Sequence, residues 1–86
     1  MRYISIREKI IKAGKNLNLI KIKSIKKDGT HTERICEPYS FRKRSTGIIF
    51  HFFCRLRNDW RSLRLQNIYE VEILEEKFKP REVVEF

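Results

Sequence analysis

The spacing of apolar residues predicts one short helix at the N-terminal end of the chain. Ser5-Ile6-Arg7-Glu8 matches a capping box, in which the Ser hydroxyl and the Glu carboxylate each satisfy a free backbone N–H at the start of a helix. Apolar residues then recur at helical spacing, and Gly14 can supply a left-handed C-terminal cap. We therefore expect a helix over about residues 6–13.

From Leu19 onward, apolar and polar residues alternate with the period of two that is typical of strands. A first strand over residues 19–24 is followed by a turn signal at residues 27–29 and a hairpin partner over residues 30–36. This partner is expected to end at Pro38, because proline cannot donate to a ladder. Residues 42–47 read as a basic loop, and three further strands are predicted over residues 48–54, 60–65 and 68–74.

One short helix followed by five short strands predicts a mainly β, α+β domain. The expected fold is a strongly bent, five-stranded antiparallel sheet such as a small barrel, with an open sheet as the alternative. A chain of 86 residues has room for one core, which six Phe, three Tyr and one Trp can fill without metal or disulfide. We divide it into a small-barrel domain, residues 1–78, and a charged C-terminal tail, residues 79–86.

Cysteine and histidine spacing argues against a metal site and against a cofactor. Cys36 and Cys54 are separated by 18 positions without a CxxC pair, and the two His residues add no ligand spacing. Both Cys lie in apolar stretches, so we expect buried, reduced thiols. The N-terminal residues contain no apolar run long enough for a signal peptide or a membrane span, which predicts a soluble, cytoplasmic protein that does not contact membranes.

The charge is strongly positive and unevenly distributed along the chain. Lys and Arg number 20 against 11 Asp and Glu, which gives a formal net charge of +9. Residues 1–67 carry 17 basic and 5 acidic side chains, whereas residues 68–86 carry 3 basic and 6 acidic side chains. This basic body favours a polyanionic partner over a merely solvated surface, on which the two signs are usually mixed.

Two stretches of the chain resemble the WYL-domain family. They are RICEPY, Arg34 to Tyr39, and IIFHFFCRLRNDWRSLRL, Ile48 to Leu65. The family pattern has an Arg and a Pro ending one strand, an aromatic-rich strand, a turn, and then Arg-x-Phe-Arg-Leu-Asp-Arg-Ile. The resemblance covers about Ile6 to Phe78. The residues that name the family correspond here to Ile48-Ile49-Phe50, and its final Asp-Arg-Ile reads Gln-Asn-Ile.

This resemblance implies an Sm-like small β-barrel with an N-terminal helix that serves as a ligand-binding or regulatory module. Such modules are found in bacterial transcription regulators, in CRISPR-associated regulators, and at the C-terminus of some superfamily 1 helicases, where they bind single-stranded DNA. The resemblance therefore also implies that the chain is part of a larger protein or a partner to one. Edge strands of small barrels can associate, so a homodimer is a further expectation.

Arginine and lysine side chains are the predicted contacts to phosphate, because the planar Arg fork binds two oxygens at once. Arg61 and Arg64 point to opposite faces by alternation unless a bulge brings them together. Their alternative role is to pair with Asp59, Glu70 or Glu72, and the alternative for residues 42–44 is an ordinary solvated turn. The basic candidates are Arg34, Arg42, Lys43, Arg44, Arg55, Arg57, Arg61 and Arg64.

Binding of single strands also needs exposed aromatic faces on which bases stack. Trp60 is the leading candidate because it follows a polar turn, and most Phe side chains are expected in the core. No nucleophile is paired with a base and no Gly-rich phosphate loop is present, so we do not expect an enzyme. The other stacking candidates are Tyr39, Phe41, His51 and Phe53.

The sequence thus predicts a non-catalytic accessory module that binds single-stranded DNA or RNA through a basic face. The principal alternative is a ligand-sensing regulatory domain that binds a nucleotide or another anionic effector in the same basic pocket. A third reading is a protein-interaction module that meets an acidic partner. Salt dependence separates the first two, because an extended strand contact gives a steeper slope of log affinity against log salt than a mononucleotide does.

Overall fold

The computed structural model describes residues 5–86, so the first four residues of the predicted barrel domain lie outside the described part. Helix α1 spans Ile6–Lys15, and the amide of Glu8 donates to the Ser5 hydroxyl at 3.2 Å, which confirms the predicted helix start. The expected cap at Gly14 is wrong. Gly14 stays within the helix, Asn16 caps it, and Leu17 takes the left-handed conformation with a φ of 57°.

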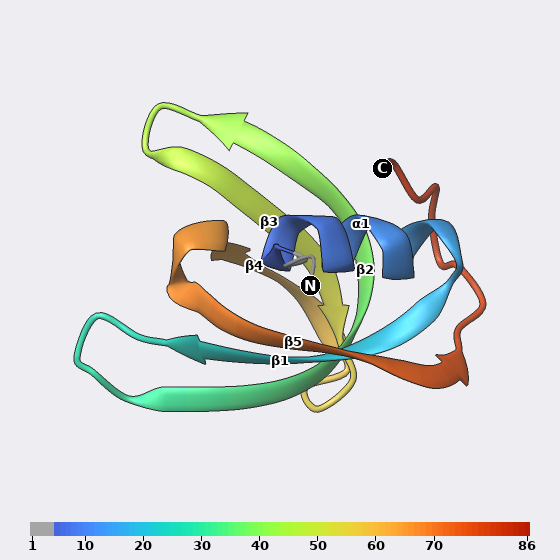
Figure 1. Ribbon diagram of the computed structural model, residues 1–86, viewed down its shortest axis with the longest axis horizontal. Helices are drawn as coiled ribbons and strands as arrows, with labels where there is room; N and C mark the ends of the chain where they lie inside the picture. The colour runs from blue at the N-terminus through green and yellow to red at the C-terminus, as the bar shows by residue number, and fades with distance from the viewer. Residues whose placement is uncertain (1–4) are drawn as a thin grey trace, which may run out of the picture.

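Five strands form one antiparallel sheet in the order β4-β3-β2-β1-β5. The sheet bends strongly, and α1 packs against β5, β1 and β2 (Figure 1). This confirms the predicted helix and bent sheet, but the sheet is not a closed barrel, because β4 and β5 are its two edges. The strands are β1 Asn18–Ile25, β2 His31–Arg44, β3 Gly47–Cys54, β4 Asp59–Arg64 and β5 Ile68–Lys77, with a 3-10 turn, Leu65–Asn67, before β5.

Strand β2 is much longer than predicted and takes part in two hairpins. It runs through Pro38 to Arg44, so the predicted strand end at Pro38 and the predicted loop over residues 42–47 are both wrong. Its pairing with β1 ends at Cys36, and its pairing with β3 has a register shift between Pro38 and Ser40. Pro38 therefore lies where β2 has left β1 and where the ladder is irregular, which a residue without an N–H tolerates.

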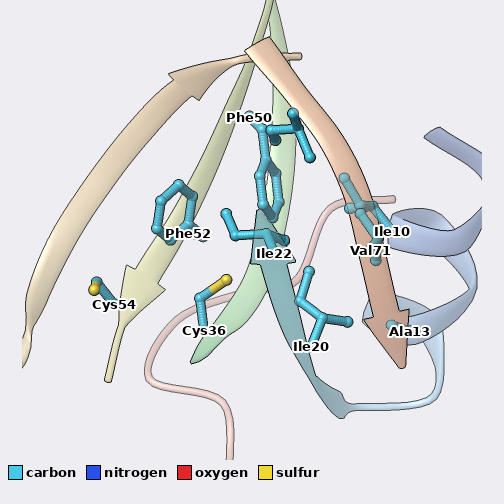
Figure 2. Close-up of a cluster of buried hydrophobic side chains, with 10 residues drawn as sticks. Ile10, Ala13, Ile20, Ile22, Cys36, Phe50, Phe52, Cys54 and Val71 are labelled. Atoms are coloured by element: carbon cyan, nitrogen blue, oxygen red, sulfur yellow. The ribbon is translucent and has the colours of Figure 1, made fainter. Parts of the chain in front are cut away.

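The main core lies on the inner face of the sheet, beneath α1. Figure 2 shows side chains from the helix and four strands meeting there, including Cys36 and Cys54, which are register partners on β2 and β3. Both thiols are free and buried, and burial raises the pKa of Cys36 well above its ordinary value. The buried members are Ile10, Ala13, Ile20, Ile22, Cys36, Phe50, Phe52, Cys54, Ile68 and Val71.

A second, smaller cluster lies on the outer face, which is the opposite face of the same strands. Its buried members are Leu19, Tyr39, Phe53 and Phe78, and Trp60 packs against them. Because successive strand residues alternate between faces, Phe52 enters the inner core while Phe53 enters the outer cluster. The apolar run of β3 is therefore explained by burial on both faces rather than on one.

After β5, the chain folds back over this outer cluster and ends with Phe86 packed against the main core. The amide of Phe78 donates to the Leu17 carbonyl at 2.9 Å, and the amide of Glu85 donates to the Tyr39 carbonyl at 2.8 Å. Ser40 and Glu85 form an isolated parallel bridge along the part of β2 that has separated from β1. We call residues 79–86 the C-terminal strap.

Candidate nucleic-acid interface

Register places three rows of outer-face residues across β2, β3 and β4. Residues that are partners in a ladder share a face, so each row brings side chains from three strands together. The first row combines two arginines, the second holds a histidine between two serines, and the third is acidic and aromatic. In order, the rows are Arg42-Ile49-Arg64, Ser40-His51-Ser62 and Glu37-Phe53-Trp60.

The first row, which we call the arginine row, lies beside the end of the β2–β3 hairpin. Arg42 is exposed and Arg64 is half-buried, and their strands lie two inter-strand spacings apart, about 10 Å. Lys43 and Arg44 follow on β2 and are exposed, and the chain then turns at Ser45-Thr46 into β3. Within the predicted basic loop, Arg42, Lys43 and Arg44 thus belong to the paired end of β2, and Ser45 and Thr46 alone form the turn.

Ion pairs within residues 5–86 leave the arginine row uncompensated. Lys23 and Glu70 are 3.1 Å apart, and Lys21 lies 3.8 Å from Glu72, so the acidic strand β5 pairs with the lysines of β1. Asp59 accepts a hydrogen bond from the Trp60 amide instead. Within the described part, Arg55 is the one predicted basic residue that makes an ion pair, so the alternative pairing of Arg61 or Arg64 with these carboxylates is not observed.

The remaining basic candidates lie elsewhere on the molecule. The β3–β4 ladder is regular from residue 59 to residue 64, so no bulge brings Arg61 and Arg64 together and they point to opposite faces. Arg57 is exposed in the β3–β4 turn. Arg34 and Arg55 line an open pocket of about 470 Å³ at that end of the sheet, together with Leu19, Glu33, Ile35, Leu56 and Glu76.

The predicted stacking aromatics are already engaged with one another. Trp60 stacks on His51 with ring centroids 5.0 Å apart and an interplanar angle of 6°, and it meets Tyr39 edge-on at 4.8 Å. Tyr39 and Phe53 are buried, and Phe41 packs against Phe50. Trp60 and His51 are half-buried, so within the outer-face rows this pair is the aromatic surface that solvent still reaches.

Beside this pair lies a buried carboxylate that the sequence did not single out. Glu37 is 1% exposed, and it accepts hydrogen bonds from Arg55 Nε at 2.8 Å, from Tyr39 Oη at 2.8 Å and from Arg81 Nε at 3.2 Å. Burial raises the pKa of Glu37, but the hydrogen bonds from Arg55, Tyr39 and Arg81 outweigh it, so the pKa lies below 4.5. Burial also raises the pKa of Tyr39, to about 12.

Arg81 belongs to the strap, and its guanidinium carbon lies 3.8 Å from the centroid of the Phe53 ring. No signal in the sequence indicates the network around Glu37, because Arg55 and Arg81 are 18 and 44 positions away from Glu37.

Within residues 5–86, no helix is long and apolar enough to span a membrane. The same residues contain no cluster of three or more His, Cys, Asp or Glu side chains that could hold a metal ion.

No family model matches the chain, and no curated protein matches it. Among solved structures, it is similar to proteasome accessory factor B/C (PafBC) of Arthrobacter aurescens, with a TM-score of 0.76 and 14% identity. The match covers 90% of this chain and 13% of that chain, so this chain spans a small part of its length. At 14% identity, this likeness concerns the fold alone.

Proposed function

We propose that this chain is a non-catalytic accessory module that binds nucleic acid, with a preference for single strands of DNA or RNA. The observation that carries the proposal is the uncompensated arginine row. Arg42 and Arg64 share a face, and Lys43 and Arg44 continue the positive charge along β2. Glu70 and Glu72 of β5 are paired with lysines of β1. When unpaired guanidinium groups bind phosphates, counterions condensed on the nucleic acid are released, which favours binding.

The preference for single strands rests on the second and third rows of the same face. His51 lies in the row next to the arginine row and Trp60 in the row after it, and both side chains remain half-buried. A single strand of nucleic acid whose phosphates contact Arg42 and Arg64 can place a base on the His51–Trp60 pair. A duplex cannot do so, because its bases are already stacked and paired. The similarity to PafBC, of which the match covers 13%, supports a module that works within a larger protein.

Fluorescence anisotropy with labelled single-stranded DNA, single-stranded RNA and duplex DNA at several salt concentrations tests the proposal. We expect the variant Arg42→Ala/Arg64→Ala to bind single strands about ten-fold more weakly. Its slope of log affinity against log salt should fall by about 1.4, since each lost contact to a single strand removes about 0.7.

The matched control is Lys21→Ala/Lys23→Ala, which removes the same charge from residues that are ion-paired. This control should weaken binding by no more than about two-fold. Equal losses in the two variants, or no binding by the native protein at moderate salt, would show that the arginine row is not a nucleic-acid site.

The second candidate function is the sensing of a small anionic effector, and the pocket that Arg34 and Arg55 share favours it. Its volume of about 470 Å³ suits a small molecule, and Leu19, Ile35 and Leu56 supply an apolar lining. A mononucleotide that binds there would compete with labelled strands only weakly and with a shallow salt slope. Undiminished binding of a labelled mononucleotide to the Arg42→Ala/Arg64→Ala variant would favour this function instead, because the variant leaves the pocket intact.

A further inference from the structure

The C-terminal strap lies over the same outer face that the proposed function assigns to nucleic acid. Glu82 Oε1 is 3.1 Å from His51 Nε2, and Arg81 covers the Phe53 ring beside Trp60. The amide of Arg81 also donates to Tyr39 Oη at 2.8 Å. Phe86 packs edge-on against Phe41, so the strap contacts four of the aromatic residues that the sequence offered as stacking platforms.

We propose that a single strand of nucleic acid binds the outer face across the His51–Trp60 stack, and that the strap occupies this site and is displaced on binding. This inference rests on the proposed function and adds a regulated site to it. In the closed form, the Glu82 carboxylate sits beside His51, where a phosphate of the bound strand would lie in the open form. The strap is thus a tethered competitor that places one acidic side chain, Glu82, where the nucleic acid would bind.

The strap is exposed over its first residues, whereas Val84 packs against the outer cluster and Phe86 against the main core. Residues 79–83 are exposed, and Val83 is 75% exposed, so little apolar surface is lost when they leave the sheet. Segments with few buried contacts open locally at low free energy. Phe78, which is 5% exposed and hydrogen-bonded to Leu17, stays in the outer cluster and marks where the strap begins.

Opening also leaves the buried carboxylate satisfied. Glu37 keeps its 2.8 Å hydrogen bonds from Arg55 and Tyr39 when Arg81 departs, and the bonds from Arg81 are longer, at 3.2 to 3.4 Å. The full penalty of an unpaired buried charge is therefore avoided. The same change releases the ring of Phe53 from beneath the Arg81 guanidinium.

Two substitutions loosen the strap by different means. Arg81→Ala removes the contacts to Glu37 and Phe53. Gly14→Ala changes no charge, but a Cβ at Gly14 would overlap the ring of Phe86, so it forces the end of the strap away from α1 while favouring the helix. Lys79→Ala is the matched control for Arg81→Ala, because Lys79 carries the same charge on the same exposed segment.

The test is binding of a labelled oligothymidylate of about 15 nucleotides to the full chain, followed by anisotropy and by the fluorescence of Trp60, the single tryptophan. We expect Arg81→Ala and Gly14→Ala to bind about five-fold more tightly than the native protein, because more of the population is already open. Lys79→Ala should bind up to about two-fold more weakly, since it only removes a positive charge.

Hydrogen exchange on the native protein gives an independent readout that does not depend on any variant. Saturating oligothymidylate should speed exchange at the amides of Arg81 and Glu85, which are hydrogen-bonded in the closed form. Slower exchange at these amides would contradict displacement of the strap. So would a result in which the native protein binds and neither loosened variant binds more tightly. Both results leave the proposed function standing. Absence of binding by every variant and by the native protein overturns both.

Discussion

Glu37 shows how one residue can connect the sheet to the strap. Its carboxylate is buried, yet its two arginine partners have side chains that are 42% and 44% exposed, so the network is solvated on one side only. Such a carboxylate is stabilised by hydrogen bonds from charged donors more than by the ion pair as such. Glu37→Gln keeps the shape of the side chain and removes the charge, which isolates this contribution.

We expect Glu37→Gln to lower the free energy of unfolding by about 2 kcal/mol at neutral pH. The pKa of Glu37 is lowered in the folded state, so its stabilisation is present above the ordinary value of 4.5 and is lost as the pH falls through the folded pKa. Urea unfolding of both proteins at neutral pH and at about pH 3 measures this. A gap between the two proteins that stays constant with pH would contradict the assignment.

Glu37 also marks a limit of sequence reasoning. In the chain it stands in Glu-Pro-Tyr, which reads as the end of a strand, and nothing near it in sequence supplies its partners. Arg55 and Arg81 reach it only because β3 pairs with β2 and because the strap returns across the sheet. Residue types offer candidates for phosphate binding, whereas the register decides which of these candidates share a face.

At the scale of elements, the helix and the number of strands were predictable because capping and alternation are local signals. The length of β2 was not. Pro38 and the run of charges after Phe41 are both local signals of irregular structure, and pairing with β3 overrides them. The difference bears on the proposed function, because pairing with β3 positions the backbone of Arg42 to Arg44.

The turn of the β2–β3 hairpin offers a test of this positioning. Gly47 has a φ of +125° and Gly29, in the β1–β2 hairpin, has a φ of +89°, and neither has an atom within 4 Å of an added Cβ. Gly47→Ala and Gly29→Ala therefore introduce backbone strain alone, and each should lower the free energy of unfolding by about 1 to 2 kcal/mol. Chemical denaturation measures both changes.

Only Gly47→Ala should also weaken binding of single strands, because it distorts the strand end that carries Arg42 to Arg44. The expected loss is about three-fold, and Gly29→Ala serves as the matched control in the same anisotropy assay. Equal affinities of the two variants would indicate that the hairpin geometry does not matter for binding.

At the scale of the whole molecule, the charge asymmetry along the chain becomes an asymmetry between regions of the sheet. The glutamates of β5 neutralise lysines on β1, which is its neighbour, so the acidic end of the chain compensates β1 and leaves the β2–β3 hairpin and β4 positive. The sequence alone shows the excess of positive charge. Which part of the surface keeps that excess follows from strand order, because β5 pairs with β1 and not with β4.

This arrangement predicts that local charge, rather than net charge, sets the affinity for nucleic acid. Glu70→Gln/Glu72→Gln raises the formal net charge of +9 by two, and Arg42→Ala/Arg64→Ala lowers it by two. Arg42 lies six residues beyond the last β2 residue that pairs with β1, which is about 20 Å of strand. Screening at 0.15 M salt acts over about 8 Å, well below the 37 Å length of the molecule.

We therefore expect Glu70→Gln/Glu72→Gln to change the affinity for oligothymidylate by less than about two-fold at that salt concentration. Its effect should grow as the salt is lowered, because the screening length then approaches the distance between the two regions of the sheet. If this variant instead gains as much affinity as Arg42→Ala/Arg64→Ala loses, the protein attracts nucleic acid through its overall charge. In that case the unpaired arginines beside His51 and Trp60 would have no special part in binding.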